Sequence, residues 1–301
     1  MRQSRGMRRR AVALALAASL LVLAACSGGD GDGGSDGAAA ESTATTTRED
    51  RLYILVTNGE GTGSAGLAPL VDALFTQPGV SVGVAAPDSP LVPPPALAPG
   101  QVPTVTFTTT PTGYPAVAVA ADSADTVRAA LSGELDGMPD DLGTPDLVVA
   151  GVNTGQLIGS LAEFSSNVPA ARAAAAEGIP ALVVAQGVDT EPPEYTAGAA
   201  EAVAWLDEHR DAIVAGDEPA QVTLLNVPSC ATGEHRGVVE VPIAADDAGR
   251  SLALVDCAST AEDPADDVAA FTTGYATLSV LPTADGPAPA GGDATTTTAG
   301  G

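Results

Sequence analysis

The stretch Leu52–Gly63 (LYILVTNGEGTG) decides the fold class of this chain. Its first six residues are mainly apolar, which is typical of a buried strand, and a glycine-rich turn follows them. Residues 65–76 then place leucine and valine side chains at helical spacing, and residues 80–85 form a second apolar run closed by Pro87 and Asp88. Together these segments predict a β-α-β unit.

The rest of the chain continues the alternation of apolar runs with segments of helical spacing. The predicted strands cover residues 104–110, 116–120, 146–150, 181–185 and 221–227, and the predicted helices cover residues 123–133, 168–177 and 196–213. Such alternation indicates an α/β fold, with three α/β/α layers around a mainly parallel, Rossmann-like sheet. The roughly 230 residues of segment 50–282 suit one domain of this kind.

The amino-terminal segment reads as an export signal. Residues 1–25 combine a basic start with the apolar stretch Ala11–Ala25, which is shorter than the roughly 20 residues that a spanning helix needs. The stretch ends in Leu-Ala-Ala-Cys26, which resembles a lipobox, although an ordinary secretory signal with a chance cysteine is the alternative. We therefore expect an extracytoplasmic protein that meets the membrane only through a lipid on Cys26.

Composition sets further bounds. Residues 26–49 are rich in Gly, Ser, Asp, Ala and Thr, which indicates a disordered tether, and residues 283–301 form a similar tail.

The formal net charge of −26 argues against a nucleic acid polymer as partner, because phosphate neutralisation drives such binding. In an exported protein, Cys230 and Cys257 more often form a disulfide than a metal site, since no His or Cys lies beside either at zinc spacing.

Three polar loops are expected at one edge of the sheet. Ligands of parallel sheets bind beyond the carboxyl ends of the strands, where residues 58–64, 87–89 and 151–167 should converge. A dinucleotide site is disfavoured there, because Ser64 falls where the third glycine of that fingerprint is needed. The one acidic residue near the end of the second strand, Asp88, follows a proline.

Collinear blocks over about 175 residues resemble the SurE family of metal-dependent 5′/3′-nucleotidases. The blocks lie at residues 55–61, 66–74, 85–88, 124–127, 145–155, 164–168, 170–172, 178–182 and 225–228. Members of this family hydrolyse nucleoside monophosphates, and some act on other phosphomonoesters. The resemblance implies a divalent metal, Mg²⁺ or Mn²⁺, held by oxygen ligands, which would polarise the phosphoryl group and activate a water.

Carried over position by position, the family's metal ligands are partly present. The two consecutive Asp of the family fall at Gly59 and Glu60, and the family's Asn is Asn153. The family's Ser falls at Val92, and Ser89 in the same loop is the available substitute. The resemblance therefore implies Glu60, Asn153 and Ser89 as metal ligands, with a reduced ligand charge.

The remaining site residues follow from the same resemblance. Asn58 is kept beside Glu60, and both are expected in the catalytic centre. Ser165, Ser166 and Asn167 stand where the family holds phosphate, directly before a predicted helix. Structural roles are the alternatives: a solvated carboxylate for Glu60, turn residues for the three asparagines, and helix caps for the two serines.

Other polar residues receive no catalytic role. His209 and His235 are isolated in the sequence, and His209 is expected to be exposed in a charged helix. Arg172 belongs to a helix of the family pattern and is expected to be structural. Family members form homodimers through carboxyl-terminal arms, whereas the segment after Val227 is short here.

Two functions remain open from the sequence. The first is an extracytoplasmic, divalent-metal-dependent phosphomonoesterase that acts on nucleotides. The second is a non-catalytic lipoprotein that uses no metal and binds a small molecule or a protein partner through the same loops.

Overall fold

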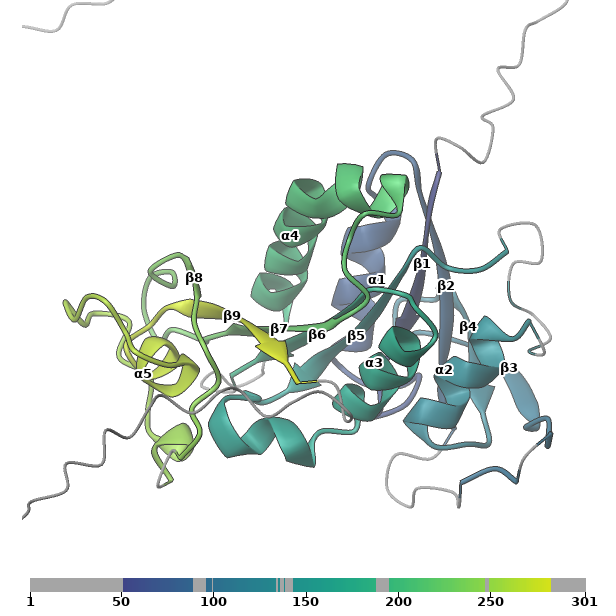
Figure 1. Ribbon diagram of the computed structural model, residues 1–301, viewed down its shortest axis with the longest axis horizontal. Helices are drawn as coiled ribbons and strands as arrows, with labels where there is room; N and C mark the ends of the chain where they lie inside the picture. The colour runs from purple at the N-terminus through teal and green to yellow at the C-terminus, as the bar shows by residue number, and fades with distance from the viewer. Residues whose placement is uncertain are drawn as a thin grey trace, which may run out of the picture. The chain divides into compact units, whose positions relative to one another are not determined.

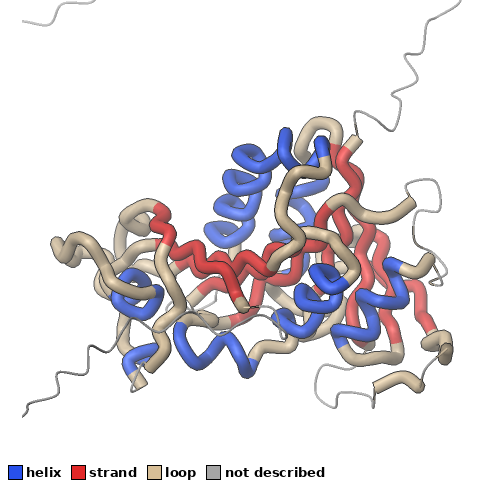
Figure 2. The backbone as a smooth tube through the Cα atoms, viewed as in Figure 1, coloured by secondary structure: helices blue, strands red, loops and turns tan. Residues whose placement is uncertain are grey.

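The computed structural model describes residues 51–88, 96–98, 100–133, 135, 138, 143–187, 195–246 and 249–282. These residues form a sheet in the strand order β3-β4-β2-β1-β5-β6-β7-β9-β8 (Figures 1 and 2). The strands are β1 (Leu52–Thr57), β2 (Val80–Pro87), β3 (Val105–Thr109), β4 (Pro115–Val119), β5 (Leu147–Thr154), β6 (Ala181–Gln186), β7 (Val222–Val227), β8 (Val238–Glu240) and β9 (Ala276–Leu281).

Helices cover both faces of the sheet, which confirms the predicted three layers (Figure 1). Helices α1 and α4 pack together on one face, and α2 and α3 pack together on the other. Their bounds, with those of the shorter helices at the β8 end, are α1 (Leu67–Phe75), α2 (Ser123–Leu131), α3 (Asn167–Ala176), α4 (Thr196–Ala215), α5 (Asp267–Thr272), η2 (Gly159–Phe164) and η3 (Arg250–Leu252).

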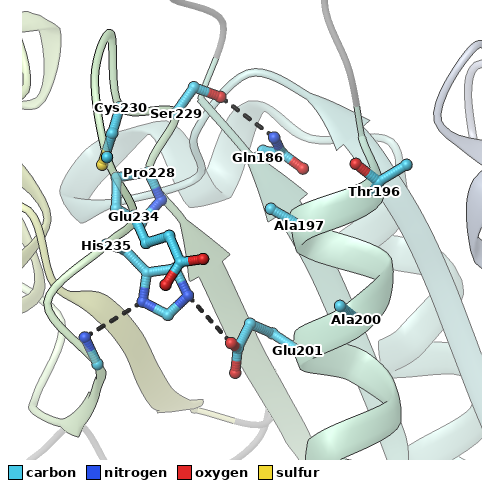
Figure 3. Close-up of a pocket in the computed structure, with 12 residues that line it drawn as sticks. Gln186, Thr196, Ala197, Ala200, Glu201, Pro228, Ser229, Cys230, Glu234 and His235 are labelled. Carbon is cyan, nitrogen blue, oxygen red and sulfur yellow. Dashed lines mark hydrogen bonds and ion pairs between the residues drawn. The ribbon is translucent and has the colours of Figure 1, made fainter. Parts of the chain in front are cut away.

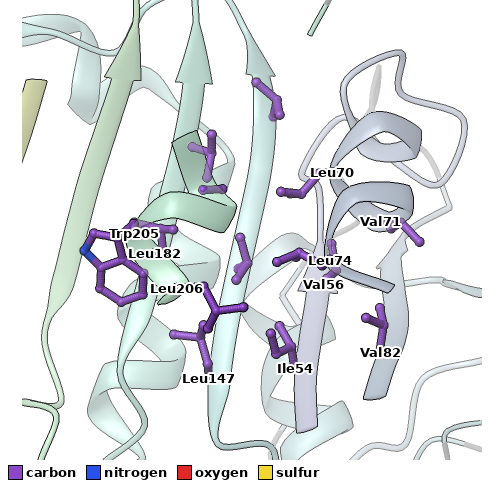
Figure 4. Packing of buried hydrophobic residues seen from close by; sticks show 14 of the residues in the cluster. Ile54, Val56, Leu70, Val71, Leu74, Val82, Leu147, Leu182, Trp205 and Leu206 are labelled. Atoms are coloured by element: carbon purple, nitrogen blue, oxygen red, sulfur yellow. The ribbon is translucent and has the colours of Figure 1, made fainter. Parts of the chain in front are cut away.

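Strand β1 is an inner strand of the sheet, between β2 and β5, and is buried on both sides. Ile54 and Val56 pack into the apolar cluster under α1 and α4, with Leu70 and Leu206 (Figure 4). Leu55 points the other way, into the cluster under α2 and α3. Each such side chain contributes about 1.5–3 kcal/mol on burial. The continuous apolar run in the sequence therefore reflects a strand that is covered on both faces.

The register brings two polar loops to one edge. Strand β1 pairs in parallel with β2 on one side and with β5 on the other, where Thr57 lies beside Ala150. The loops that follow β1 and β5 consequently leave the sheet at the same edge. This is the edge at which the sequence predicts the site.

Strand β5 is longer than predicted. The apolar run ends at Ala150, but the strand continues to Thr154, with a register shift against β6 between Ala150 and Asn153. The peptide bond between Gly151 and Val152 is cis. A Cβ on Gly151 would lie 2.4 Å from the Val184 carbonyl oxygen, so no other residue fits at this position without a shift. The extension carries Asn153 to the edge of the sheet.

The region after Val227 departs most from the prediction. It adds β9 antiparallel to β7, β8 parallel to β9, and α5 beside β9. The sequence signal is weak because β9 buries two polar residues, Thr277 and Ser279, among its apolar ones. Cys230 and Cys257 form the predicted disulfide, with a Cα–Cα distance of 5.8 Å.

Within the described part of the chain, no helix has both the length and the apolar character needed to cross a membrane. The predicted signal, Cys26, the tether and the tail lie outside the described residues.

Candidate functional site

Asn58 organises the turn after β1. Its side chain is fully buried, and its Nδ2 donates to the Ser64 Oγ at 3.1 Å and to the Val152 carbonyl oxygen at 3.2 Å. Its Oδ1 accepts a hydrogen bond from the Glu60 backbone N–H at 2.9 Å. An Asn that bonds its own backbone two residues on shapes a turn. Asn58 therefore positions Glu60, and its own polar atoms are occupied.

Glu60 bridges the loop after β1 and the end of β5. Its Oε2 accepts from the Ser64 hydroxyl at 2.9 Å. Its Oε1 accepts from the Thr154 backbone N–H at 3.3 Å and from the Thr154 hydroxyl. Glu60 is partly buried. The carboxylate is thus held between two loops and is not a freely solvated surface group.

A second polar cluster joins β5 to the start of α3. The Asn153 Oδ1 accepts from the Asn167 Nδ2 at 3.0 Å and from the Ser165 Oγ at 3.3 Å. The Asn167 Oδ1 accepts from the Gly59 backbone N–H at 2.8 Å, and the Ser165 Oγ accepts from the Asn167 backbone N–H at 3.0 Å. Asn153, Ser165 and Asn167 are buried. The two clusters therefore meet through the backbone of Gly59 and Glu60.

Gly59 has no space for a side chain. A Cβ at this position would lie 2.2 Å from the Ser166 Oγ and 2.8 Å from the Ser166 carbonyl carbon. Ser166 is exposed, and its carbonyl oxygen accepts a hydrogen bond from the Ser123 hydroxyl. Its side chain forms no cap hydrogen bond with α3. The close approach of Ser166 thus fills the volume in which a side chain of residue 59 would lie.

Charged groups around these clusters are few. Among the described residues, no three His, Cys, Asp or Glu side chains lie close enough together to hold a metal ion. Arg172 forms a two-point pair with Glu163, at 2.9 and 3.1 Å. The hydrogen bond from Arg172 lowers the pKa of the Glu163 carboxyl. This pair gives Arg172 the partner that the sequence could not supply.

Comparison with known proteins agrees with this architecture. Residues 54–248 match the family described as Survival protein SurE. The chain is 30% identical over 253 residues to the 5′-nucleotidase SurE of Chloroflexus aggregans, which covers 75% of this chain and 91% of that protein. The chain belongs to the SurE family. The solved SurE protein from Aquifex aeolicus shares the fold, with a TM-score of 0.56 and 20% identity over 76% of this chain and 92% of that one.

The SurE match spans both polar clusters. Glu60, Asn153, Ser165 and Asn167, which the SurE resemblance singled out, come together at the edge formed by β1 and β5. Ser89 and Val92 lie outside the described residues. The neighbouring Asp88 is exposed, and its backbone N–H donates to the Val119 carbonyl oxygen. Thr154 and Ser64, which hold the Glu60 carboxylate, lie in the predicted polar loops, but the sequence analysis gave them no role in the site.

A cavity of about 540 Å³ lies farther along the same SurE edge, at the ends of β6 and β7 (Figure 3). The first turns of α4 form one wall, and the segment that follows β7 forms the other. His235 is not isolated, because its Nε2 lies 3.0 Å from the Glu201 Oε1 across this cavity. Gln186 and Ser229 hydrogen bond at its floor.

His209 also differs from the prediction. Its side chain is 35% exposed, its ring stacks on Trp205 with centroids 4.2 Å apart, and its Nδ1 lies 3.0 Å from the Glu218 Oε2. The expectation of a simple solvent-exposed histidine was therefore wrong. Glu218 follows the carboxyl end of α4, so the helical pattern alone cannot reveal this contact.

Proposed function

We propose that this SurE-family chain binds phosphomonoesters, nucleoside monophosphates foremost, at the edge formed by β1 and β5. The supporting observation is the buried network of Asn153, Ser165 and Asn167 at the start of α3. Amide groups at a helix start favour an anion, and α3 carries no acidic residue in its first turn. The 5′-nucleotidase name of the Chloroflexus relative supports a nucleotide as ligand.

The described residues do not fit a divalent metal as they are arranged. An amide oxygen has two acceptor sites, and the Asn153 Oδ1 already accepts two hydrogen bonds. Both oxygens of Glu60 accept hydrogen bonds from protein groups. Gly59 supplies no ligand and has no space for one. Mg²⁺ is usually held by one or two protein carboxylates together with waters and phosphate oxygens, and the carboxylate available here, Glu60, is bonded to Ser64 and Thr154, so the proposed binding of phosphomonoesters uses no metal.

Metal-dependent phosphomonoester hydrolysis is the second candidate. Its support is that Glu60 contacts Thr154, the residue next to Asn153, so two of the three oxygen ligands implied by the family lie on adjacent strand ends. The third, Ser89, is outside the described residues. This function requires the Glu60 carboxylate to leave Ser64 and Thr154.

Binding of adenosine monophosphate by calorimetry tests the proposed function. We expect wild-type chain to bind it equally well with and without EDTA. Asn167→Asp keeps the side-chain shape but removes the Nδ2 donor to the Asn153 Oδ1 and adds a negative charge beside the phosphate. It is therefore expected to weaken this binding at least tenfold. Adenosine serves as the matched ligand, since it lacks the phosphate and should be affected little. No binding of adenosine monophosphate to wild type would contradict the proposal.

The proposal includes export and lipid attachment through Cys26, as the basic and apolar start of the chain indicates. The mass of the mature amino-terminal peptide tests this part. A lipid-modified Cys26 as first residue supports it, and an unprocessed start at Met1 contradicts it.

A further inference from the structure

A second cavity, of about 440 Å³, lies on the face of the sheet that carries α4, away from the phosphomonoester site. The second half of α4 forms its roof, the loop after α4 forms one end, and strands β7, β9 and β8 form its floor. The residues that line it are Trp205, His209, Glu218, Gln221, Thr223, Glu240, Val241, Pro242, Leu278, Ser279 and Val280.

The floor follows from the strand register. Glu240 of β8 lies beside Leu278 of β9, and Val280 lies beside Thr223 of β7. Leu278 and Val280 are two residues apart and so point to the same face. Helix α4 packs over β5, β6 and β7, which leaves the outer strands to line the cavity. The floor therefore combines the apolar Leu278 and Val280 with the hydroxyl-bearing Thr223 and Ser279, and Glu240 lies at its rim.

The roof and the end wall add an aromatic surface and a buried carboxylate. Trp205 is 5% exposed and belongs to the core, as Figure 4 shows, and the His209 ring stacks on it. The Glu218 side chain is 7% exposed, and its Oε2 lies 3.0 Å from the His209 Nδ1. A carboxylate at this depth is costly unless it is paired, and the His209 ring is the partner that lies against Glu218.

Apart from His209, the ionisable side chains that line the cavity are acidic. Glu218 and Glu240 carry negative charge into it, and no Arg or Lys is among the residues that line it. The chain as a whole contains no lysine and has a formal net charge of −26. An anion is disfavoured here. A bare metal ion is disfavoured too, since no three acidic or histidine side chains converge among the described residues.

We propose that this cavity binds a small organic cation, an alkylammonium group whose charge lies against Glu218. The ammonium lies against the Glu218 carboxylate beside the His209 ring. The alkyl part packs against Leu278, Val280 and Pro242, which bare cations cannot do. The volume admits a chain of several carbons. This site is independent of the proposed binding of phosphomonoesters.

Trp205 reports on this cavity directly, because it is the only tryptophan of the chain. The experiment titrates the full chain with n-butylammonium chloride at constant ionic strength and follows tryptophan fluorescence. A saturable change is expected with n-butylammonium. None is expected with n-butanol or butyrate, which have the same carbon chain without the positive charge.

Two variants separate this site from general attraction to an acidic protein. Glu218→Gln keeps the side-chain shape and a hydrogen-bonding group toward His209, and is expected to weaken n-butylammonium binding at least tenfold. Glu208→Gln removes the same charge from an exposed position on α4 and should leave binding unchanged. Glu240→Gln, at the exposed rim, should weaken binding less than Glu218→Gln and serves if that variant fails to fold.

Three results would overturn the assignment. One is the absence of a saturable fluorescence change in wild type up to 100 mM n-butylammonium. Another is equal binding by wild type and both cavity variants. A change of the same size with n-butanol would also overturn it, because the site would then recognise the alkyl chain alone.

Discussion

Replacing Asp267 with alanine is expected to lower the free energy of unfolding by about 4 kcal/mol. The Asp267 side chain is fully buried at the start of α5. Its Oδ2 accepts from the Gly159 backbone N–H at 2.8 Å, and its Oδ1 accepts from the Ala244 backbone N–H at 2.8 Å. Alanine leaves both donors buried without a partner, and each such loss costs about 1–3 kcal/mol. Urea unfolding of both proteins measures the difference.

The same residue makes stability depend on pH. Burial, the largest cause, raises the pKa of Asp267 above its ordinary value, while hydrogen bonds from backbone N–H groups oppose that rise. A raised pKa in the folded state means that folding favours the protonated form. The contribution is therefore present below the unfolded pKa and is lost as pH rises through the folded pKa.

Asp267→Asn serves as the control for this dependence, since it cannot titrate. The difference in unfolding free energy between wild type and Asp267→Asn should shrink as pH rises through the raised pKa of Asp267. A change of less than about 1 kcal/mol for Asp267→Ala would show that the residue does not hold η2 and α5 together.

Removing the disulfide is the other change with a large expected effect. Cys230 and Cys257 are 27 residues apart in sequence. Closing a loop of this length restricts the unfolded chain by about 3.5 kcal/mol in the chain-entropy estimate. The double variant Cys230→Ser and Cys257→Ser should lose about this much stability in urea. The segment between them carries β8 and η3, so the loss should fall on the carboxyl-terminal part of the sheet.

A reducing agent provides the matched control. It should destabilise wild type to the level of the double variant and leave the double variant unchanged. Wild type that keeps its stability after complete reduction, verified by thiol titration, would contradict a stabilising role for the bond.

The sequence predicted the centre of the fold because local pattern and tertiary environment agree there. Strand β1 is a continuous apolar run, and the structure covers it on both faces. The sequence analysis missed the strands and the helix of the carboxyl-terminal part because several of their buried residues are polar. Thr277, Ser279 and Asp267 are buried and polar, and the hydrogen-bond partners of Ser279 and Asp267 are distant in sequence. Periodicity cannot reveal such contacts.

The sequence predicted where the candidate site lies but not which hydrogen bonds its side chains form. Family motifs marked Glu60, Asn153 and Asn167, and the structure brings them to one edge. The hydrogen bond that Glu60 accepts from Thr154 depends on the extension of β5 beyond Ala150, which the apolar pattern does not contain. The SurE resemblance therefore predicted metal ligands at Glu60 and Asn153. In the structure, the side-chain oxygens of these two residues accept hydrogen bonds from other protein groups.

The central claim is that this edge binds phosphomonoesters without a divalent metal. Phosphate release from adenosine monophosphate, measured with Mg²⁺, with Mn²⁺ and with EDTA, tests it most directly, with Glu60→Ala measured in parallel. The account predicts that neither metal raises phosphate release above the rate in EDTA, while calorimetric binding of the nucleotide persists. Metal-stimulated release that Glu60→Ala abolishes would contradict the account and establish a working SurE metal centre.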